Sequence, residues 1–313
     1  MTGEAGPLQG SKMLYVFVYV SDLAASRAFY ETKLGLTVIE EDDEAVKFDA
    51  GEIIIALNRA SDWGVPVSST QDDTSIFVFH VDDIDAMRSA LETRGVEFSG
   101  PTVRYDIGAT ATFYDPDGHC FGLYEASRMA LMWPSAERIR GILGHPTHDG
   151  DPVSTRGMKP IDPAARGLGT RKMIYLFLFV KDVAHARHFY ADLLGLPIVE
   201  AAPDGTVVKY DAGGVMLATH LVACEEGARA TLDDLDRPRT IAPVFSASDV
   251  EAVFETLLSR NVRFLTKPTR SAIGTVAKFE DPSGHLFYVY EPSAAALEWP
   301  SGRKIEAIVN QPA

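Results

Sequence analysis

The feature that most constrains the fold of this chain is an internal duplication. The apolar and aromatic run MLYVFVYVSD at residues 13–22 returns as MIYLFLFVKD at residues 173–182, which lies 160 positions later (173 minus 13). Each run is too short to span a membrane, and each closes on an Asp that is suited to cap a helix. Each copy is therefore predicted to be a strand that leads into a helix.

Further matching segments follow in the same order along both halves of the chain. They are Phe29-Tyr30 and Phe189-Tyr190, Leu34-Gly35 and Leu194-Gly195, residues 47–51 and 209–213, residues 115–119 and 281–285, and residues 131–135 and 297–301. The chain is thus predicted to be a tandem duplication. Residues 12–143 form one domain with a C-terminal helical extension, 144–171 a linker rich in Gly and Pro, and 172–311 a second, equivalent domain. Ser135 and Ser301 are expected to cap the extension helices, and residues 1–11 to be a frayed tail.

Each half is itself predicted to contain two similar units. In the first half, a strand is followed by a helix from Asp22 to Gly35 and by strand-like runs at 36–40, 45–49 and 52–57. A second unit begins near residue 74, with a strand at 76–81, a helix at 83–94, and strands at 96–98, 110–114 and 120–124. The pattern predicts an α+β fold made of paired βαβββ units.

Composition excludes several classes of function. The chain has 46% apolar and 23% charged residues, as a folded globular protein does, and a formal net charge of −15. Such an acidic chain is not expected to bind nucleic acid or an anionic membrane, but would suit a cationic ligand. No apolar run is long enough to cross a bilayer. The two cysteines, Cys120 and Cys224, occupy non-equivalent places in the two halves, so a reducing cytoplasm is expected.

The motifs resemble those of the vicinal oxygen chelate superfamily, which includes glyoxalase I, bleomycin-resistance proteins and extradiol dioxygenases. They are an opening strand that ends in Val-x-Asp, the Phe-Tyr and Leu-Gly pairs, and a closing Asp-Pro-x-Gly hairpin whose strand ends in Glu. The resemblance covers about residues 12–126 and 172–292. It implies that each pair of units curls into a half-open, cup-shaped β-barrel, flanked by helices, around a small-molecule pocket.

The resemblance also implies where metal ligands would lie. The positions on the first strands of the four units are Tyr15, Ile76, Tyr175 and Ala242; those on the last strands fall near Ala56 and Ala218 and on Glu125 and Glu291. Each domain thus retains one carboxylate and no histidine. One carboxylate beside an apolar wall does not provide the converging donors that a divalent cation requires. We therefore expect no metal and no cofactor.

The histidines elsewhere are not expected to replace the missing ligands. His119 and His285 follow the Asp-Pro-x-Gly turn, where they are expected to stabilise a hairpin. His185 and His188 are expected on a helix surface, His80 and His220 near strand ends, and His145 and His148 in the linker.

Strand alternation groups the residues that are expected to line the pockets. One pocket would be lined by Tyr15, Phe17, Tyr19 and Glu125, and the other by Tyr175, Phe177, Phe179 and Glu291. The two Tyr and the two Glu are the candidate catalytic residues, and the four other aromatic residues are the candidate substrate-binding residues. A Glu that faces a Tyr in an apolar cup is expected to have a raised pKa and could act as a general acid or base.

These features favour a metal-free protein that binds and sequesters a small, partly aromatic compound, as bleomycin-resistance proteins do, and the acidic charge would suit a cationic one. The alternative is a metal-independent lyase, isomerase or cyclase that uses a pocket Glu–Tyr pair. A metal-dependent glyoxalase or dioxygenase is a weaker form of that alternative, because the histidines are absent. A small molecule is the expected partner. The sequence leaves undecided whether the chain forms a homodimer and which domain is active.

Overall fold

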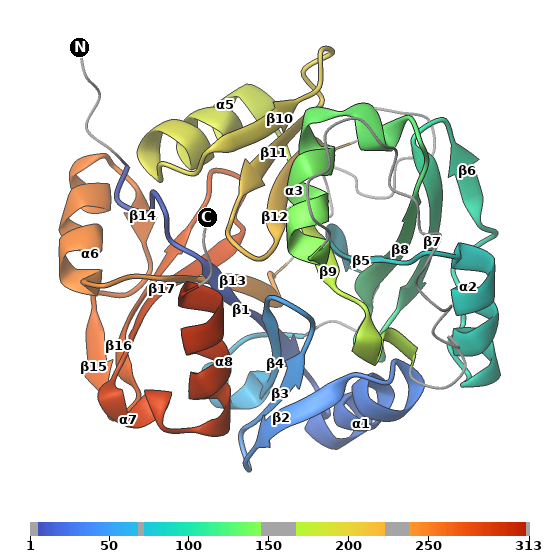
Figure 1. Ribbon diagram of the computed structural model, residues 1–313. Helices are drawn as coiled ribbons and strands as arrows, with labels where there is room; N and C mark the ends of the chain where they lie inside the picture. The colour runs from blue at the N-terminus through green and yellow to red at the C-terminus, as the bar shows by residue number, and fades with distance from the viewer. Residues whose placement is uncertain (1–5, 68–71, 145–166, 223–237, 311–313) are drawn as a thin grey trace.

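Two large, open β-sheets dominate the computed structural model, which describes residues 6–67, 72–144, 167–222 and 238–310 (Figure 1). Sheet A has the strand order β14-β16-β17-β13-β1-β4-β3-β2, with β15 paired to β16, and sheet B has the order β10-β11-β12-β9-β5-β8-β7-β6. Each order ends in two edge strands, so neither sheet closes into a barrel. The α+β duplication with half-open cups is therefore confirmed.

The strands and helices have the following bounds. Sheet A contains β1 (Met13–Val20), β2 (Thr37–Glu41), β3 (Ala45–Asp49), β4 (Ile54–Arg59), β13 (Ile241–Ser246), β14 (Arg263–Phe264), β15 (Thr269–Ser271), β16 (Gly274–Glu280) and β17 (Leu286–Pro292). Sheet B contains β5 (Asp72–His80), β6 (Val103–Tyr105), β7 (Gly108–Tyr114), β8 (His119–Ala126), β9 (Met173–Val180), β10 (Ile198–Ala201), β11 (Val207–Asp211) and β12 (Met216–Leu221). The α-helices are α1 (Leu23–Ala28), α2 (Ile84–Thr93), α3 (Pro134–Leu143), α5 (Val183–Arg187), α6 (Val250–Ser259), α7 (Ala294–Leu297) and α8 (Pro300–Val309).

Each sheet combines one unit from each half of the chain. Sheet A joins β1–β4 of the first half to β13–β17 of the second, and the seam is an antiparallel pairing of β1 with β13. Sheet B joins β9–β12 to β5–β8 through an antiparallel pairing of β5 with β9. The two units of one domain therefore do not share a cup, which corrects the expected pocket composition. The halves exchange units, and each cup needs both of them.

Asp residues begin the helices that follow the opening strands of the four units. The carboxylates of Asp22, Asp83, Asp182 and Asp249 each accept the N–H three residues further on, at 3.0, 2.9, 3.0 and 2.9 Å. The helices α1 and α5 continue as π-helical turns at Phe29–Lys33 and His188–Leu193.

The principal core lies on the helix side of both sheets and is rich in aromatic side chains. Phe77 and Phe121 stack with ring centroids 4.8 Å apart, and Tyr30 packs edge-on against Phe121 at 5.6 Å. The other face of each sheet carries a separate apolar cluster, which lines its concave side. The alternation of side chains along the strands thus separates the core from the pockets.

Short segments before each opening strand bind the two halves together. The backbone N–H of Leu8 donates to the carbonyl of Leu194 at 2.9 Å, and the N–H of Leu168 donates to that of Leu34 at 2.6 Å. The side chains of Leu8 and Leu168 are fully buried. The expectation of a frayed tail at residues 1–11 is therefore wrong for residues 6–11, because the apolar Leu8 gains more from burial than from exposure.

The C-terminal helix of each half packs beside the opening unit of the other half. The helix α8 contacts β1 and β2, and α3 contacts β10. Their capping residues are Trp299 and Trp133, which make no side-chain cap hydrogen bond. The prediction that Ser135 and Ser301 cap these helices is thus wrong: Pro occupies the first helical position, so each Ser already lies inside the helix.

The expected strand at residues 96–98 needs correction, and the expected linker cannot be compared with the structure over most of its length. Residues 96–98 form no strand, and only Phe98 makes an isolated bridge, to Phe113. Most of the expected linker at 144–171, with His145 and His148, lies outside the described residues. Within the described part of the chain, no helix has the length and apolar character needed to cross a membrane.

Candidate functional site

A cavity of about 250 Å³ lies on the concave side of sheet A. Its lining comes from strands of both halves and from α7 and α8. The lining side chains are Tyr15, Phe17, Asp42, Glu44, Ala45, Lys47, Ala56, Asn58, Trp63, Val244, Ile273, Val276, Tyr288, Tyr290, Ala296, Trp299, Ser301 and Ile305, together with Gly274. Because β1 and β17 belong to different halves, neither half could form this cavity alone.

Aromatic rings form the wall of the cavity. The ring of Phe17 lies 5.7 Å from that of Tyr15, 5.5 Å from that of Tyr288 and 6.1 Å from that of Trp63, all at tilted angles. The hydroxyl of Tyr19 shares a hydrogen bond of 2.8 Å with that of Tyr288. That bond satisfies two buried hydroxyls and connects β1 to β17 across the intervening strand β13. Tyr19 itself is fully buried behind the wall.

The mouth of the cavity is apolar and acidic. Trp63, Ile273 and Trp299 all line it, yet 46%, 43% and 42% of their surfaces stay exposed. Large exposed apolar side chains that gather at a cavity are typical of a binding site. Asp42 and Glu44, in the exposed turn between β2 and β3, add two carboxylates to the same lining.

A polar network fixes α8 against the cavity. Lys47, on β3, forms an ion pair with Glu40 and donates to the Ser301 hydroxyl at 3.2 Å. The other Glu40 oxygen accepts the N–H of Ser301 at 3.0 Å, in the first turn of α8. Burial alone would raise the pKa of Glu40, but the bonds from Lys47 and Ser301 hold it below its ordinary value. The Lys47 ammonium also lies 5.4 Å from the ring centre of Trp299.

The same network recurs in sheet B. Lys209 donates to Glu200 at 2.8 Å and to Ser135 at 3.1 Å, and Glu200 accepts the N–H of Ser135 at 3.0 Å. The Lys209 ammonium lies 5.2 Å from the ring centre of Trp133. A network that is present in both cups serves to attach the C-terminal helices, whatever else each cup does.

The tyrosines at the expected ligand positions stay protonated. Burial raises the pKa of Tyr15 and of Tyr175 well above the ordinary tyrosine value, although hydrogen bonds with Ser301 and Ser135 oppose the rise. Burial likewise raises the pKa of Tyr290 to about 12. At neutral pH these side chains are therefore hydrogen-bonding hydroxyls and not phenolates.

The two cups differ in the strands that the second units contribute. Tyr288 and its neighbour Lys278 in sheet A correspond to Gly122 and Thr112 in sheet B. In sheet B, Tyr175 and Phe177 have ring centroids 5.1 Å apart, and Phe179 lies 5.3 Å from His220. The predicted aromatic residues thus lie on the concave faces, although the fully buried Tyr19 does not line the cavity. Tyr288 extends the aromatic wall in sheet A, where sheet B has Gly122.

The two glutamates face away from the predicted tyrosines. Glu125 accepts the N–H of Ile84 at 2.8 Å, and Glu291 accepts that of Val250 at 3.2 Å, so both bind the first turns of helices. The cup-facing neighbours are Tyr124 and Tyr290, since a shift of one residue moves a side chain to the other face of a strand. Moreover, Tyr15 and Glu125 lie in different sheets. The expected Tyr15–Glu125 and Tyr175–Glu291 pairs are therefore wrong, and a catalytic role for either Glu stays a prediction.

The residues at the expected metal positions do not fit a divalent cation. Those on the first strands are Tyr15, Ile76, Tyr175 and Ala242, none of which offers an imidazole or carboxylate donor. Of the last-strand positions, only Glu125 and Glu291 carry a carboxylate, and each of them binds the first turn of a helix. The described ranges contain no group of three or more His, Cys, Asp or Glu that could hold a metal. We therefore derive no chemistry through a bound metal.

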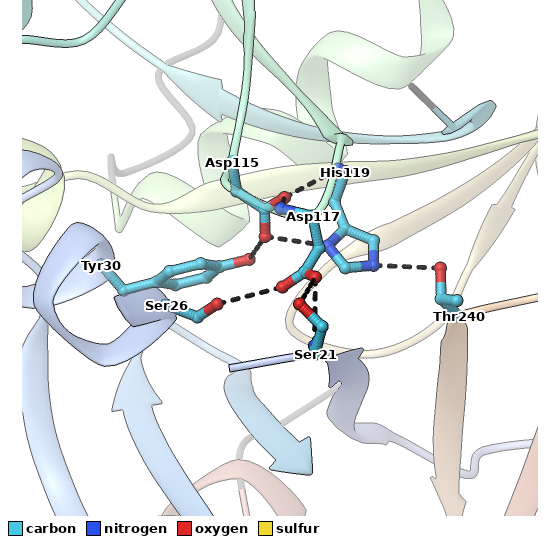
Figure 2. Close-up of polar contacts among 7 residues, drawn as sticks. All are labelled: Ser21, Ser26, Tyr30, Asp115, Asp117, His119 and Thr240. Carbon is cyan, nitrogen blue, oxygen red and sulfur yellow. Dashed lines mark hydrogen bonds and ion pairs between the residues drawn. The ribbon is translucent and has the colours of Figure 1, made fainter. Parts of the chain in front are cut away.

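His119 belongs to a buried polar cluster that connects the two sheets (Figure 2). Its Nδ1 lies 2.8 Å from Asp115, which also accepts the Tyr30 hydroxyl at 2.9 Å, and its Nε2 lies 3.0 Å from the Thr240 hydroxyl. Asp117 completes the cluster, because it accepts the hydroxyl of Ser26 at 3.1 Å and the backbone N–H of Ser21 at 3.0 Å.

The second half repeats much of this cluster. Nδ1 of His285 lies 3.0 Å from Asp281, and Asp281 accepts the Tyr190 hydroxyl at 2.7 Å. Burial alone would raise the pKa of Asp281, but His285 and the other donors hold it below its ordinary value. His185 and His188 are exposed on α5 and its continuation. His119, His285, His185 and His188 thus lie outside the aromatic walls of the cups, whereas His220 lies beside Phe179.

Comparison with known proteins agrees with this geometry. The model of the glyoxalase/bleomycin resistance protein/dioxygenase superfamily matches residues 12–123 and 172–289, which is more than half of the chain. The chain belongs to this superfamily. The two matched segments correspond to the two halves of the duplication, and the recognised resemblance is confirmed.

Solved members of the superfamily share the whole arrangement. Glyoxalase I from Zea mays has 15% identity and a TM-score of 0.59, with 96% of this chain and 97% of that chain covered. A putative dioxygenase from Bacillus subtilis has 15% identity and a TM-score of 0.58, with 99% and 92% covered. The uncharacterized protein YurT of Bacillus subtilis is 27% identical over an alignment of 130 residues, with 38% of this chain and 98% of that protein covered. At these identities the structural likeness shows the fold and no activity.

Several site residues were not identified from the sequence. Trp63 and Trp299 carried no signal beyond being aromatic, since neither lies on a predicted pocket strand. Lys47 recurs as Lys209, and that repetition could have indicated the network with Glu40. Tyr288 could have been found by extending strand alternation back from Tyr290 along the closing strand.

Proposed function

We propose that the sheet-A cavity binds a small, partly aromatic organic cation. The observation that carries this proposal is the aromatic cavity with two carboxylates at its mouth. A volume of about 250 Å³ suits a compact ligand, or the ring of a larger one that protrudes between Trp63 and Trp299.

The aromatic wall supplies most of the expected affinity. A planar ligand that packs against Phe17 and Tyr288 would bury apolar area on the wall, and each square ångström is worth about 25 cal/mol. The ring faces of Trp63 and Trp299 at the mouth attract cations, and such contacts contribute about 0.5 to 2 kcal/mol. Tyr15 and Tyr290 add hydroxyls that can hydrogen-bond a polar group of the ligand.

The charge distribution favours a cationic ligand over an anionic one. Lys47 lines the cavity, but its charge is already neutralised by Glu40. The carboxylates of Asp42 and Glu44 lie in the exposed turn at the mouth, so they add a local negative potential to the net charge of −15. An approaching cation would be attracted at low ionic strength.

Native mass spectrometry of the purified full chain tests whether it retains a small molecule. Binding without catalysis predicts that the molecule extracted from the protein has the same mass and structure after renewed incubation with it. A new mass or an isomer would instead support the metal-independent enzyme.

A pair of isosteric probes tests the preferred charge. Benzyltrimethylammonium and neopentylbenzene have the same shape, but only the first is charged. We expect the cation to bind about twofold to thirtyfold more tightly, as measured by tryptophan fluorescence. Trp299→Phe should reduce that preference, whereas Trp133→Phe, the equivalent change beside sheet B, should leave it unaltered. Equal affinities for the two probes would contradict the proposed ligand charge.

A further inference from the structure

Three lysines lie on strands whose side chains face the cups, and one of them differs from the other two. Lys47 and Lys209 are paired with Glu40 and Glu200. Lys278, on β16, shares the strand face of Val276, which packs in the apolar cluster on the concave side of sheet A. Among the described residues, no carboxylate pairs with Lys278. The acid nearest to it along that strand face, Glu280, is already paired with Arg263.

The environment of Lys278 is aromatic. Lys278 lies directly opposite Tyr288 in the β16–β17 pairing, and its ammonium lies 5.5 Å from the centre of that ring. Tyr288 lines the cavity, whereas Lys278 does not itself line it and meets the aromatic wall at Tyr288 from the side of β16. Its backbone is held firmly, because its N–H donates to the Thr266 hydroxyl at 3.0 Å and its carbonyl accepts the N–H of Leu265 at 2.8 Å.

The internal duplication shows that the fold does not require this lysine. The equivalent residue in sheet B is Thr112, which lies opposite Gly122. A partly buried ammonium without a carboxylate partner is costly to maintain, and the equivalent position avoids that cost. Lys278 and Tyr288 are thus a feature of the cup that contains the cavity, and we infer that they serve its ligand.

We propose that Lys278 is a carbonyl-reactive amine that holds an aldehyde-bearing ligand of the sheet-A cavity as a reversible imine. The proposal rests on the proposed function of that cavity. The lone pair of neutral Nζ attacks the aldehyde carbon and forms a C–N bond. The carbonyl oxygen then leaves as water with the two hydrogens of the amine, so a C=N bond replaces C=O and nothing is oxidised or reduced.

Burial supports this chemistry by its effect on protonation. Burial lowers the pKa of Lys278 from the ordinary lysine value, because the charged ammonium is poorly solvated beside the aromatic wall. Each unit of lowering raises the fraction of neutral amine at pH 7 about tenfold. A desolvated lysine beside apolar groups is a recognised form of activated amine nucleophile.

Reductive trapping tests the proposal on the full chain. The protein is incubated at pH 7 with benzaldehyde and sodium cyanoborohydride, and benzylated lysines are located by peptide mass spectrometry. We expect Lys278 to be labelled faster than the exposed Lys267, because more of its amine is neutral at this pH. Excess benzyltrimethylammonium should slow labelling at Lys278 and not at Lys267. Lys278→Arg should lose the fast label, and Lys267→Arg should retain it.

Two results would overturn the proposal: equal labelling of Lys278 and Lys267, or labelling of Lys278 that benzyltrimethylammonium does not slow although it binds. Should Lys278→Arg fail to fold, Lys278→Thr introduces the residue that the equivalent position tolerates. Binding of benzyltrimethylammonium to the unmodified protein tests the cavity by itself. A failure of the proposed function is therefore distinguishable from a failure of the imine.

Discussion

Replacing Glu40 with Gln should destabilise the protein and loosen α8. The Glu40 carboxylate accepts from both Lys47 and the backbone of Ser301, and an amide of the same shape can accept only one of these bonds. The side chains of Lys47 and Glu40 are 16% and 13% exposed, so the pair is intermediate between surface and buried. Surface pairs are worth about 0 to 1 kcal/mol, and breaking a buried pair costs about 3 to 5 kcal/mol. We expect a loss of about 2 to 3 kcal/mol.

The loss should depend on pH in a defined direction. The folded pKa of Glu40 lies below the ordinary value of 4.5, so its carboxylate stabilises the fold fully above that pH. The contribution disappears as the pH falls through the lower folded pKa. The difference in unfolding free energy between the wild type and Glu40→Gln should therefore be largest at neutral pH and shrink below about pH 4.5.

Urea unfolding at a series of pH values measures this difference. Glu200→Gln is the matched variant, because Glu200 makes the same contacts with Lys209 and Ser135. Both variants should lose similar stability, while Glu40→Gln alone should also weaken the binding of benzyltrimethylammonium. A change below about 0.5 kcal/mol at pH 7, or one that grows on acidification, would refute the stabilising role of the network.

Three further substitutions test how the halves are joined. His119→Ala should lower the free energy of unfolding by about 2 to 4 kcal/mol, because it leaves a buried Asp115 oxygen without its imidazole partner. Calorimetry should show one unfolding transition at a lower temperature, and an unchanged Tm would contradict the role of His119 in joining the halves. Leu8→Ala and Leu168→Ala should each cost about 2 to 4 kcal/mol in urea unfolding, since both side chains are fully buried in equivalent places. A negligible cost for Leu8→Ala alone would show that the N-terminal segment is not part of the folded core.

The duplication and its strands were predictable because they depend on local signals. The Asp caps, the apolar runs and the glycines after Leu34 and Leu194 each specify structure within a few residues of themselves. Those signals recur at matching distances, and the repetition removed most of the ambiguity in any single segment. Residues 96–98 were the exception, since their short apolar run is paired at Phe98 only.

The exchange of units was not predictable from such signals. The opening strand β1 pairs with β13, yet β5 offers a similar apolar run and belongs to the same half. Local pattern cannot distinguish these partners, because the choice depends on how linking segments and helices pack. The same error affected the predicted pocket. It placed Tyr15 and Glu125 in one cup, whereas the two residues lie in different sheets.

The candidate site was predictable for strand residues and not for residues that reach the cup from elsewhere. Tyr15, Phe17 and Tyr175 followed from alternation along β1 and β9. Trp63 and Trp299 lie in a turn after β4 and before α8, where no periodicity marks the direction of a side chain. The assignment of Glu125 failed by one residue, since Tyr124 occupies the cup-facing position.

A cavity-filling pair of variants tests the binding site most directly. Ala56 lines the cavity opposite Phe17, and Ala218 holds the equivalent place opposite Phe177 in sheet B. Titration with benzyltrimethylammonium, followed by tryptophan fluorescence, compares Ala56→Leu with Ala218→Leu. A ligand site in sheet A predicts that Ala56→Leu weakens binding at least about tenfold, while Ala218→Leu binds like the wild type. Unchanged binding in a folded Ala56→Leu protein, or a loss confined to Ala218→Leu, would contradict it.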